Sequence, residues 1–194
     1  KNPEKFIEGI YRLGLATDFH IPIAGYSPAK IRMPHKNSHG QYDNWNATAL
    51  PWMSIGYETH VPPISTLTFY NAIANGGKMM KPRFVKQIIK NGEVVYNNPP
   101  QVIKEHIAKE STIKEITRIL TEVVSEGLGK KAGSDKFLVA GKTGTAQMSK
   151  GALGYKAGGT NYLLSFAGFF PADKPRYSCI VCIQKTGLPA SGGG

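Results

Sequence analysis

The stretch VAGKTGTAQ, residues 139–147, decides how this chain is interpreted, because its Lys-Thr-Gly centre allows three chemical explanations. It can be a phosphate-binding loop, one wall of an acyl-transfer site, or a strand that ends in solvent. A phosphate-binding loop needs a glycine five residues before its Gly-Lys-Thr. Lys136 occupies that position, and the apolar run at 137–140 leads in as extended backbone that cannot curl around a phosphate. We therefore exclude the phosphate-binding loop.

Residues 142–145 combine the groups that a carboxylate-binding strand edge requires. Lys142 supplies a positive charge, and Thr143 and Thr145 supply hydroxyls. Gly144 removes the side chain that would keep a ligand off the strand. Strand alternation places Lys142 and Gly144 on one face and the threonines on the other, so all four serve one site only if the strand borders a cleft. There the Thr145 N–H could donate to a developing oxyanion, a contact worth on the order of 3–4 kcal/mol.

A second Lys-Thr-Gly, Lys185 to Gly187, shows that the tripeptide alone is a weak signal. It follows the strand-like run CIVCIQ and continues into LPASGGG. This context predicts a strand exit and a loop without chemistry of its own. The neighbours of each copy must therefore decide between the acyl-transfer wall and a plain strand end.

The composition indicates one globular domain over residues 1–194. Apolar residues make up 41% and charged residues 19% of the chain, and no window reaches the roughly 20 apolar residues of a membrane span. The net charge of +11 invites a nucleic-acid interpretation, but lysine and arginine are spread along the chain without a nucleic-acid-reading motif. We expect no nucleic-acid partner, and a setting near a membrane or an acidic polymer fits the charge better.

The two cysteines, Cys179 and Cys182, stand in the apolar run YSCIVCIQ. Strand positions three apart point to opposite faces, so the pair cannot easily share a metal ion or a disulfide. We expect a buried strand with two small core side chains, and neither a metal nor a cofactor.

Hydrophobic periodicity predicts helices at 3–13, from Pro63 to a left-handed Gly76, and at 112–124, the last with a Thr112–Glu115 capping box. Residues 16–53 lack a period and are expected to form a long irregular connection. Residues 83–97 predict a peripheral hairpin turning at Asn91-Gly92. Three strand-like runs follow: KFLVAGKTGTAQ, YLLSFAGFF and RYSCIVCIQ. Helices followed by a late antiparallel sheet predict an α+β fold.

These blocks resemble the transpeptidase domain of penicillin-binding proteins, most closely the monofunctional class B enzymes. VAGKTGTAQ is similar to the Lys-Thr-Gly strand of that family, SFAGFFPADKPRYSCIVCI to its next two strands, FYNAIANGG to a helix after its serine motifs, and VVSEGLGKKA to the approach to the Lys-Thr-Gly strand. The resemblance implies the penicillin-binding and serine β-lactamase-like fold, with an antiparallel sheet packed by helices. The run SFAGFFPADKPRY favours the division type.

By resemblance, the enzyme forms a serine acyl-enzyme with a D-Ala-D-Ala stem peptide or a β-lactam and then cross-links peptidoglycan. Lys142 would support proton transfer and electrostatics. Thr143, Gly144 and Thr145 would bind the substrate, with the Thr145 N–H as half of the oxyanion hole.

The family's nucleophilic serine, in Ser-x-x-Lys, is not expected in this chain. Ser111 to Lys114 lies only 31 residues before Lys142, without a Ser-x-Asn between them, so Ser111 is interpreted as a helix cap. Pro28 and the surrounding loop exclude Ser27. We expect the serine upstream of Lys1, which makes the chain a C-terminal portion, incomplete at both ends and inactive alone.

The resemblance also implies a bacterial cell-envelope location, as a periplasmic domain at the outer face of the cytoplasmic membrane, anchored by a segment outside this chain. Other cell-wall synthesis or division proteins are the expected protein partners. The alternatives are an inactive or β-lactam-sensing member of the same fold, and an unrelated basic binding module. Glu58, Pro62 and Ser65 depart from the Gly, Thr and Gln usual in the family.

Overall fold

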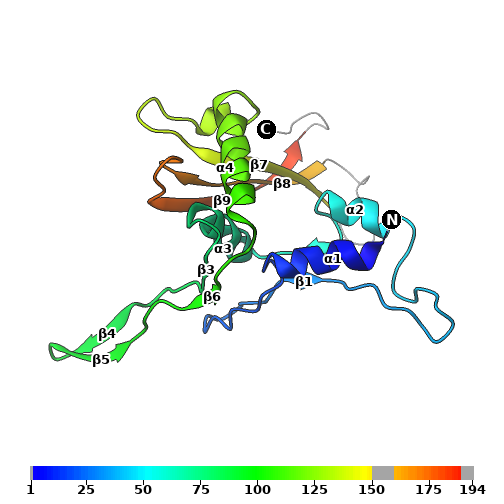
Figure 1. The fold of residues 1–194 in the computed structure, drawn as a ribbon, viewed down its shortest axis with the longest axis horizontal. Helices are drawn as coiled ribbons and strands as arrows, with labels where there is room; N and C mark the ends of the chain where they lie inside the picture. Colours follow the sequence, from blue (N-terminus) through cyan, green and yellow to red (C-terminus); the bar gives the residue numbers. More distant parts are fainter. Residues whose placement is uncertain (1, 150–159, 189–194) are drawn as a thin grey trace. The chain divides into compact units, whose positions relative to one another are not determined.

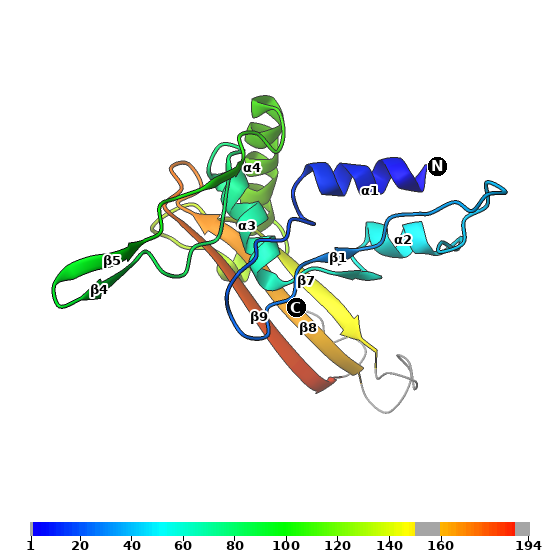
Figure 2. The same cartoon turned by 90° about the horizontal axis from the view of Figure 1, so that it is seen from below.

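The computed structural model describes residues 2–149 and 160–188. The chain divides into two compact units, residues 1–109 and 110–194. Figures 1 and 2 show helices together with antiparallel strands, as predicted for an α+β fold. Within the described ranges, no helix combines the length and the apolar character needed to cross a membrane.

The first unit begins with helix α1, Pro3–Arg12. The Asn2 side chain caps it by accepting a hydrogen bond from the Lys5 N–H at 3.1 Å, and a proline in the first turn loses no helical hydrogen bond. Gly14 follows with φ +85°, where a side chain would be strained and would also collide with Met79. The buried face of α1 joins a small core made of Ile7, Ile31 and Met53, with Ile10, Leu15, Ala16, Trp45 and Val61 packed around it.

The segment 16–53, expected to be irregular, contains two short elements. Strand β1, Lys30–Ile31, pairs antiparallel with β2, Thr59–His60. Helix α2, Ala49–Ser54, overlaps the end of the segment. This helix is too short to give a detectable period, and the burial of Met53 shows that tertiary packing stabilises it.

One position that departs from the family pattern carries an unusual backbone. Glu58 has φ +54°, a left-handed conformation that costs a non-glycine residue energy. Its carboxylate pairs with Arg32, whose guanidinium also lies 5.3 Å from the centre of the Trp45 ring. The ion pair and the cation–π contact compensate in part for the backbone conformation.

Helix α3, Pro63–Ala74, buries the face that carries Ser65, Thr68, Ala72 and Ile73. Gly76 follows at φ +66°. Strand β3, Met79–Met80, pairs with β6, Val102–Lys104. Between them, β4, Gln87–Lys90, and β5, Glu93–Asn97, form a hairpin that extends away from the other elements of its unit (Figures 1 and 2). Asn91 and Gly92 both have positive φ, as a type I′ turn requires.

The second unit begins with α4, Glu110–Ser125, which buries Ile113, Leu120 and Val124. The helix starts two residues before the predicted capping box, so Ser111 and Thr112 lie inside its first turn and the prediction that they cap it is wrong. Glu110 stands at the helix start instead. Its carboxylate interacts favourably with the positive end of the helix dipole and pairs with Lys114 at 2.7 Å.

The sheet of this unit contains β7, Ala140–Met148, β8, Thr160–Phe170, and β9, Tyr177–Leu188, antiparallel with β8 in the centre. Helix α4 packs against β7. The turn between β8 and β9 is closed by the Arg176 N–H, which donates to the Phe170 carbonyl at 3.1 Å. The ring of Phe170 stacks on Phe137.

Two expectations about β9 are wrong. Cys179 and Cys182 are exposed free thiols rather than core residues. Among the described strands β9 is an edge strand, and its apolar Val181 and Ile183 remain half exposed, so an apolar run did not imply burial. The second Lys-Thr-Gly lies inside the strand and not in a loop. Gly187, at φ +71°, allows a bulge there, since Lys185 pairs with Tyr162 and Leu188 pairs with Thr160.

Candidate functional site

The candidate site is the first edge of the three-stranded sheet, strand β7. Its register against β8 is continuous from Ala140, opposite Phe169, to Met148, opposite Asn161. Because β7 pairs on one side only among the described strands, the other side leaves a row of backbone N–H and C=O groups available to a ligand. Figure 2 shows β7 at this outer position.

The glycine of the motif makes close contact with the neighbouring strand. Gly144 lies opposite Ser165, and a Cβ placed on Gly144 would sit 2.5 Å from Ser165 Oγ. Lys142 shares this face and lies opposite Ala167. The face is therefore shaped by three small residues beside one exposed lysine.

Gly141, which precedes the motif, has a structural role in the packing of the sheet. Gly141 lies opposite Gly168, and a Cβ on Gly141 would come within 2.4 Å of the end of the Phe166 ring. The glycine pair accepts this ring on the face that carries Thr143 and Thr145. Packing of the sheet thus explains Gly141 without any ligand.

The charge at the site is held close to the strand backbone. Lys142 Nζ donates to the carbonyl of Thr143 at 2.9 Å. The side chains of Lys142 and Thr145 are exposed, and Thr143 and Gly144 are half-buried. An ammonium, two hydroxyls and a side-chain-free stretch of backbone therefore lie within four consecutive residues, a combination that can bind a carboxylate.

The glycine-rich segment VVSEGLGKKA leads the chain from the end of α4 towards β7. The Gly127 N–H donates to the Glu122 carbonyl at 3.0 Å, and the Gly129 N–H donates to the Val123 carbonyl at 2.9 Å. These hydrogen bonds satisfy carbonyl groups in the last turn of α4. A Cβ on either glycine would lie 2.9 Å from the Val123 carbonyl oxygen. These glycines let the chain turn tightly from α4 toward β7.

Sequence reasoning named residues 142–145 and missed Ser165. The structure brings Ser165 to the motif through the β7–β8 register, a relation that no local pattern states. Neither Ser-x-x-Lys string of the chain forms a serine–lysine site: Lys30 begins strand β1, and Lys114, although it shares helix α4 with Ser111, is paired with Glu110. No group of three potential metal ligands is found among the described residues.

Comparisons with known proteins identify the family of the chain. The family model described as "Penicillin binding protein transpeptidase domain" matches residues 24–194. Penicillin-binding protein PbpB of Mycolicibacterium smegmatis is 27% identical over 183 residues, which cover 90% of this chain and 26% of that protein. The "Peptidoglycan D,D-transpeptidase FtsI homolog" of Mesostigma viride is 26% identical over 209 residues, covering 98% of this chain and 33% of that protein.

Among solved structures, penicillin-binding protein 3 of Mycobacterium tuberculosis complexed with ampicillin superposes with a TM-score of 0.78 at 25% identity. The match covers 95% of this chain and 40% of that structure. The chain thus spans about a quarter to a third of the two curated relatives named above. Because the family model matches residues 24–194, which is most of the chain, the chain belongs to the penicillin-binding protein transpeptidase family.

Proposed function

We propose that residues 142–145 form the substrate-binding wall of a serine D,D-transpeptidase that cross-links peptidoglycan stem peptides and is acylated by β-lactams. The observation that carries this proposal is the open edge of β7, with the Lys142 ammonium against the Thr143 carbonyl. The name of the Mesostigma relative and the ampicillin bound to the mycobacterial protein support the same reaction class.

The backbone of β7 suits the oxyanion hole. The Thr143 carbonyl accepts from an exposed lysine, so it faces the open side of the strand. Residues two apart on a strand direct their N–H and C=O groups the same way. The Thr145 N–H therefore faces the open edge, where it can donate to the oxyanion of a tetrahedral intermediate. Removing one such donor typically slows acyl transfer by about 100- to 1,000-fold.

The two hydroxyls and the ammonium bind the substrate in different ways. Thr143 and Thr145 hydrogen-bond the substrate or β-lactam carboxylate, while Lys142 balances its charge and supports proton transfer. Gly144 lets the substrate lie along the backbone. All four groups bind or orient, so the reaction still requires a nucleophile.

We propose that a serine outside residues 1–194 supplies the nucleophile, and that the isolated chain is inactive. The chain covers 26% and 33% of the two relatives named above. Of its own Ser-x-x-Lys strings, Ser27 to Lys30 runs from a loop into β1, and Ser111 to Lys114 begins α4 but has its lysine paired with Glu110. As a whole, the protein would act in the cell envelope, at the outer face of the cytoplasmic membrane and with other cell-wall synthesis or division proteins.

The two Lys-Thr-Gly copies provide a matched test in the whole protein that contains this chain. Lys142→Ala should lower the second-order rate of acylation by fluorescent penicillin by about 100-fold, as loss of proton-transfer support does. Lys185→Ala, in β9, should leave the rate within about twofold of wild type, because we assign this copy no chemistry. Equal rates in both variants would remove Lys142 from the site. Acylation without turnover of a D-Ala-D-Ala substrate would indicate a β-lactam sensor instead.

A further inference from the structure

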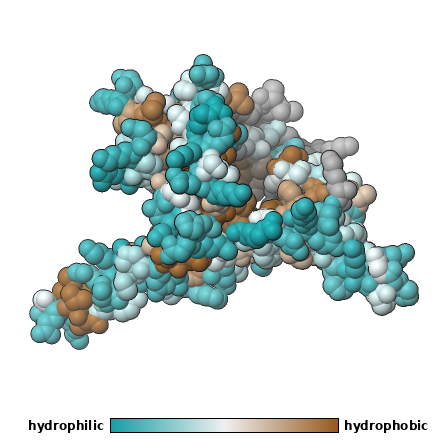
Figure 3. All heavy atoms as spheres, in the orientation of Figure 1, coloured by the Kyte–Doolittle hydropathy of each residue, from teal (hydrophilic) through white to brown (hydrophobic). Residues whose placement is uncertain are grey.

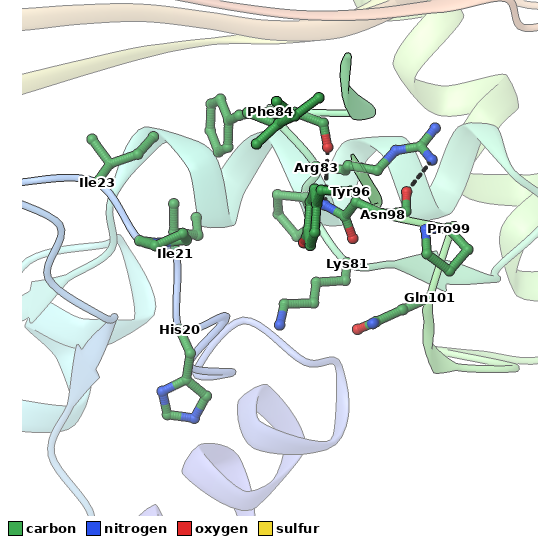
Figure 4. Close-up of a pocket in the computed structure, with 14 residues that line it drawn as sticks. His20, Ile21, Ile23, Lys81, Arg83, Phe84, Tyr96, Asn98, Pro99 and Gln101 are labelled. Carbon is green, nitrogen blue, oxygen red and sulfur yellow. Dashed lines mark hydrogen bonds between the residues drawn. The ribbon is translucent and has the colours of Figure 1, made fainter. Parts of the chain in front are cut away.

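A second site lies in the first unit, at the base of the β4–β5 hairpin. A pocket of about 450 Å³ opens between one face of the hairpin and residues 20–23, within the volume range of ligand sites. Figure 4 shows Ile21 and Ile23 on one side of it, with Phe84 and Tyr96 on the other. This pocket lies outside the β7 site and has no part in the proposed acyl transfer.

The apolar part of the pocket continues onto the hairpin surface. All residues of β4 and β5 are exposed, and Ile88 and Tyr96, which face each other across the ladder, are 51% and 48% accessible. Phe84, at the base, is 60% accessible. Figure 3 shows hydrophobic surface gathered on the hairpin. Exposed apolar side chains gathered on one element can form an interaction site.

The polar part of the pocket is basic. Lys81 and Gln101 extend in the same direction, on the side where His20 lies (Figure 4), and no described carboxylate lines the pocket. Arg83 adds a second cation, although its guanidinium donates to the Asn98 carbonyl. Asp18, beside His20, accepts hydrogen bonds from the His20 N–H and the Tyr26 hydroxyl; its charge also interacts with that of Lys81, but Asp18 does not line the pocket.

We propose that this pocket, with the adjoining hairpin face, binds an extended segment of a partner protein that carries a bulky apolar side chain next to a carboxylate. The apolar side chain fills the space between Phe84, Ile88 and Ile21, and the carboxylate pairs with Lys81. Among the described strands, β4 and β5 pair only with each other, so each outer edge can also pair with an extended backbone.

The position of the apolar residues favours a protein segment over a lipid surface. The tip of the hairpin, Lys90 to Glu93, is polar, whereas insertion into a bilayer would place apolar residues at the tip. Here Ile88 and Tyr96 border a hollow that an anchoring side chain can fill. In protein interfaces, a few side chains buried in well-packed pockets carry most of the binding energy.

Two matched pairs of variants in the whole protein test the proposal. Ile88→Asn changes the pocket, whereas Ile89→Asn changes an equally exposed neighbour that does not line it. Lys81→Gln removes the pocket cation, and Lys86→Gln removes a lysine outside the pocket. The probe is a fluorescent octapeptide of alternating Glu with Leu or Phe, and a copy with Gln for Glu serves as the uncharged control. Circular dichroism checks that each variant folds.

We expect saturable binding of the acidic peptide by fluorescence anisotropy. Ile88→Asn, Lys81→Gln and the Gln peptide should each weaken it by at least about tenfold, with Ile89→Asn and Lys86→Gln within about twofold of wild type. No saturable binding, or equal losses in both members of a pair, would overturn the proposal. Membrane binding would also overturn the proposal. In that case the protein would sediment with phosphatidylglycerol vesicles, and Ile88→Asn and Ile89→Asn would reduce this sedimentation equally. The β-lactam acylation rate should be unchanged throughout.

Discussion

The most informative substitution at the β7 site is Gly144→Ala, because it separates packing from substrate approach. Gly144 could be required for either reason: its Cβ would meet Ser165, and its Cβ would also stand where we place the substrate. The structure lets the two reasons be tested separately. The added carbon would lie 2.5 Å from Ser165 Oγ but 3.9 Å from Ser165 Cβ, so removing the hydroxyl removes the collision.

The expected effect on stability is small. Rotating Ser165 away from the new methyl group costs about 0.5–1.5 kcal/mol. Replacing glycine by alanine within a strand returns about 0.5–1 kcal/mol. The free energy of unfolding of Gly144→Ala should therefore change by no more than about 1 kcal/mol. A double variant, Gly144→Ala with Ser165→Ala, should regain whatever stability is lost.

Gly144→Ala should greatly lower the acylation rate, and adding Ser165→Ala should not restore it. A methyl group between strand and substrate displaces the reacting carbonyl by about 1 Å, which can cost about 100-fold in rate. The assay is the acylation rate of the whole protein with fluorescent penicillin, with urea unfolding of the same variants as the stability control. If the double variant acylates at the wild-type rate, Gly144 serves only the contact with Ser165 and our placement of the substrate is wrong.

Three further predictions concern the first unit. Glu58→Gly should raise the free energy of unfolding by about 0.5–1 kcal/mol, measured by urea titration, because relief of the left-handed backbone outweighs the lost exposed pair with Arg32; a loss of stability would contradict this balance. Gly92→Ala should destabilise the hairpin by about 1 kcal/mol and speed amide exchange in β4 and β5, and unchanged exchange would argue against the type I′ turn. The His20 N–H bonded to the Asp18 carboxylate holds the pKa of Asp18 below its usual value. This contribution to stability is present above the unfolded pKa of about 3.9 and disappears as the pH falls through the lower folded pKa. A carboxyl NMR titration of Asp18 should show the lowered pKa, and a value of 3.9 or above would refute it.

Local patterns predicted most of the regular elements. The periodicity at 3–13 and 112–124 corresponds to α1 and α4, and Asn91-Gly92 forms the turn between β4 and β5. These features succeed because helix period and turn chemistry act over a few neighbouring residues. The α2 helix was missed for the same reason, since its six residues are held by the burial of Met53 in a core built from distant segments.

Burial was harder to predict than structure type. The apolar run around Cys179 predicted a core strand, yet β9 is an edge strand of the described sheet and both cysteines are exposed. Whether a strand is covered depends on what packs on its faces, which its own sequence does not state. Ser165 was missed because its contact with Gly144 exists only through the β7–β8 register.

The central claim is that the β7 edge holds the substrate, and a structure of the whole protein acylated by ampicillin tests it most directly. We predict that the drug carboxylate lies within hydrogen-bond distance of the Thr143 or Thr145 hydroxyl. The acyl carbonyl oxygen should lie roughly 2.7–3.1 Å from the Thr145 nitrogen. An acylated drug whose carboxylate and carbonyl make no contact with residues 142–145 would contradict the account.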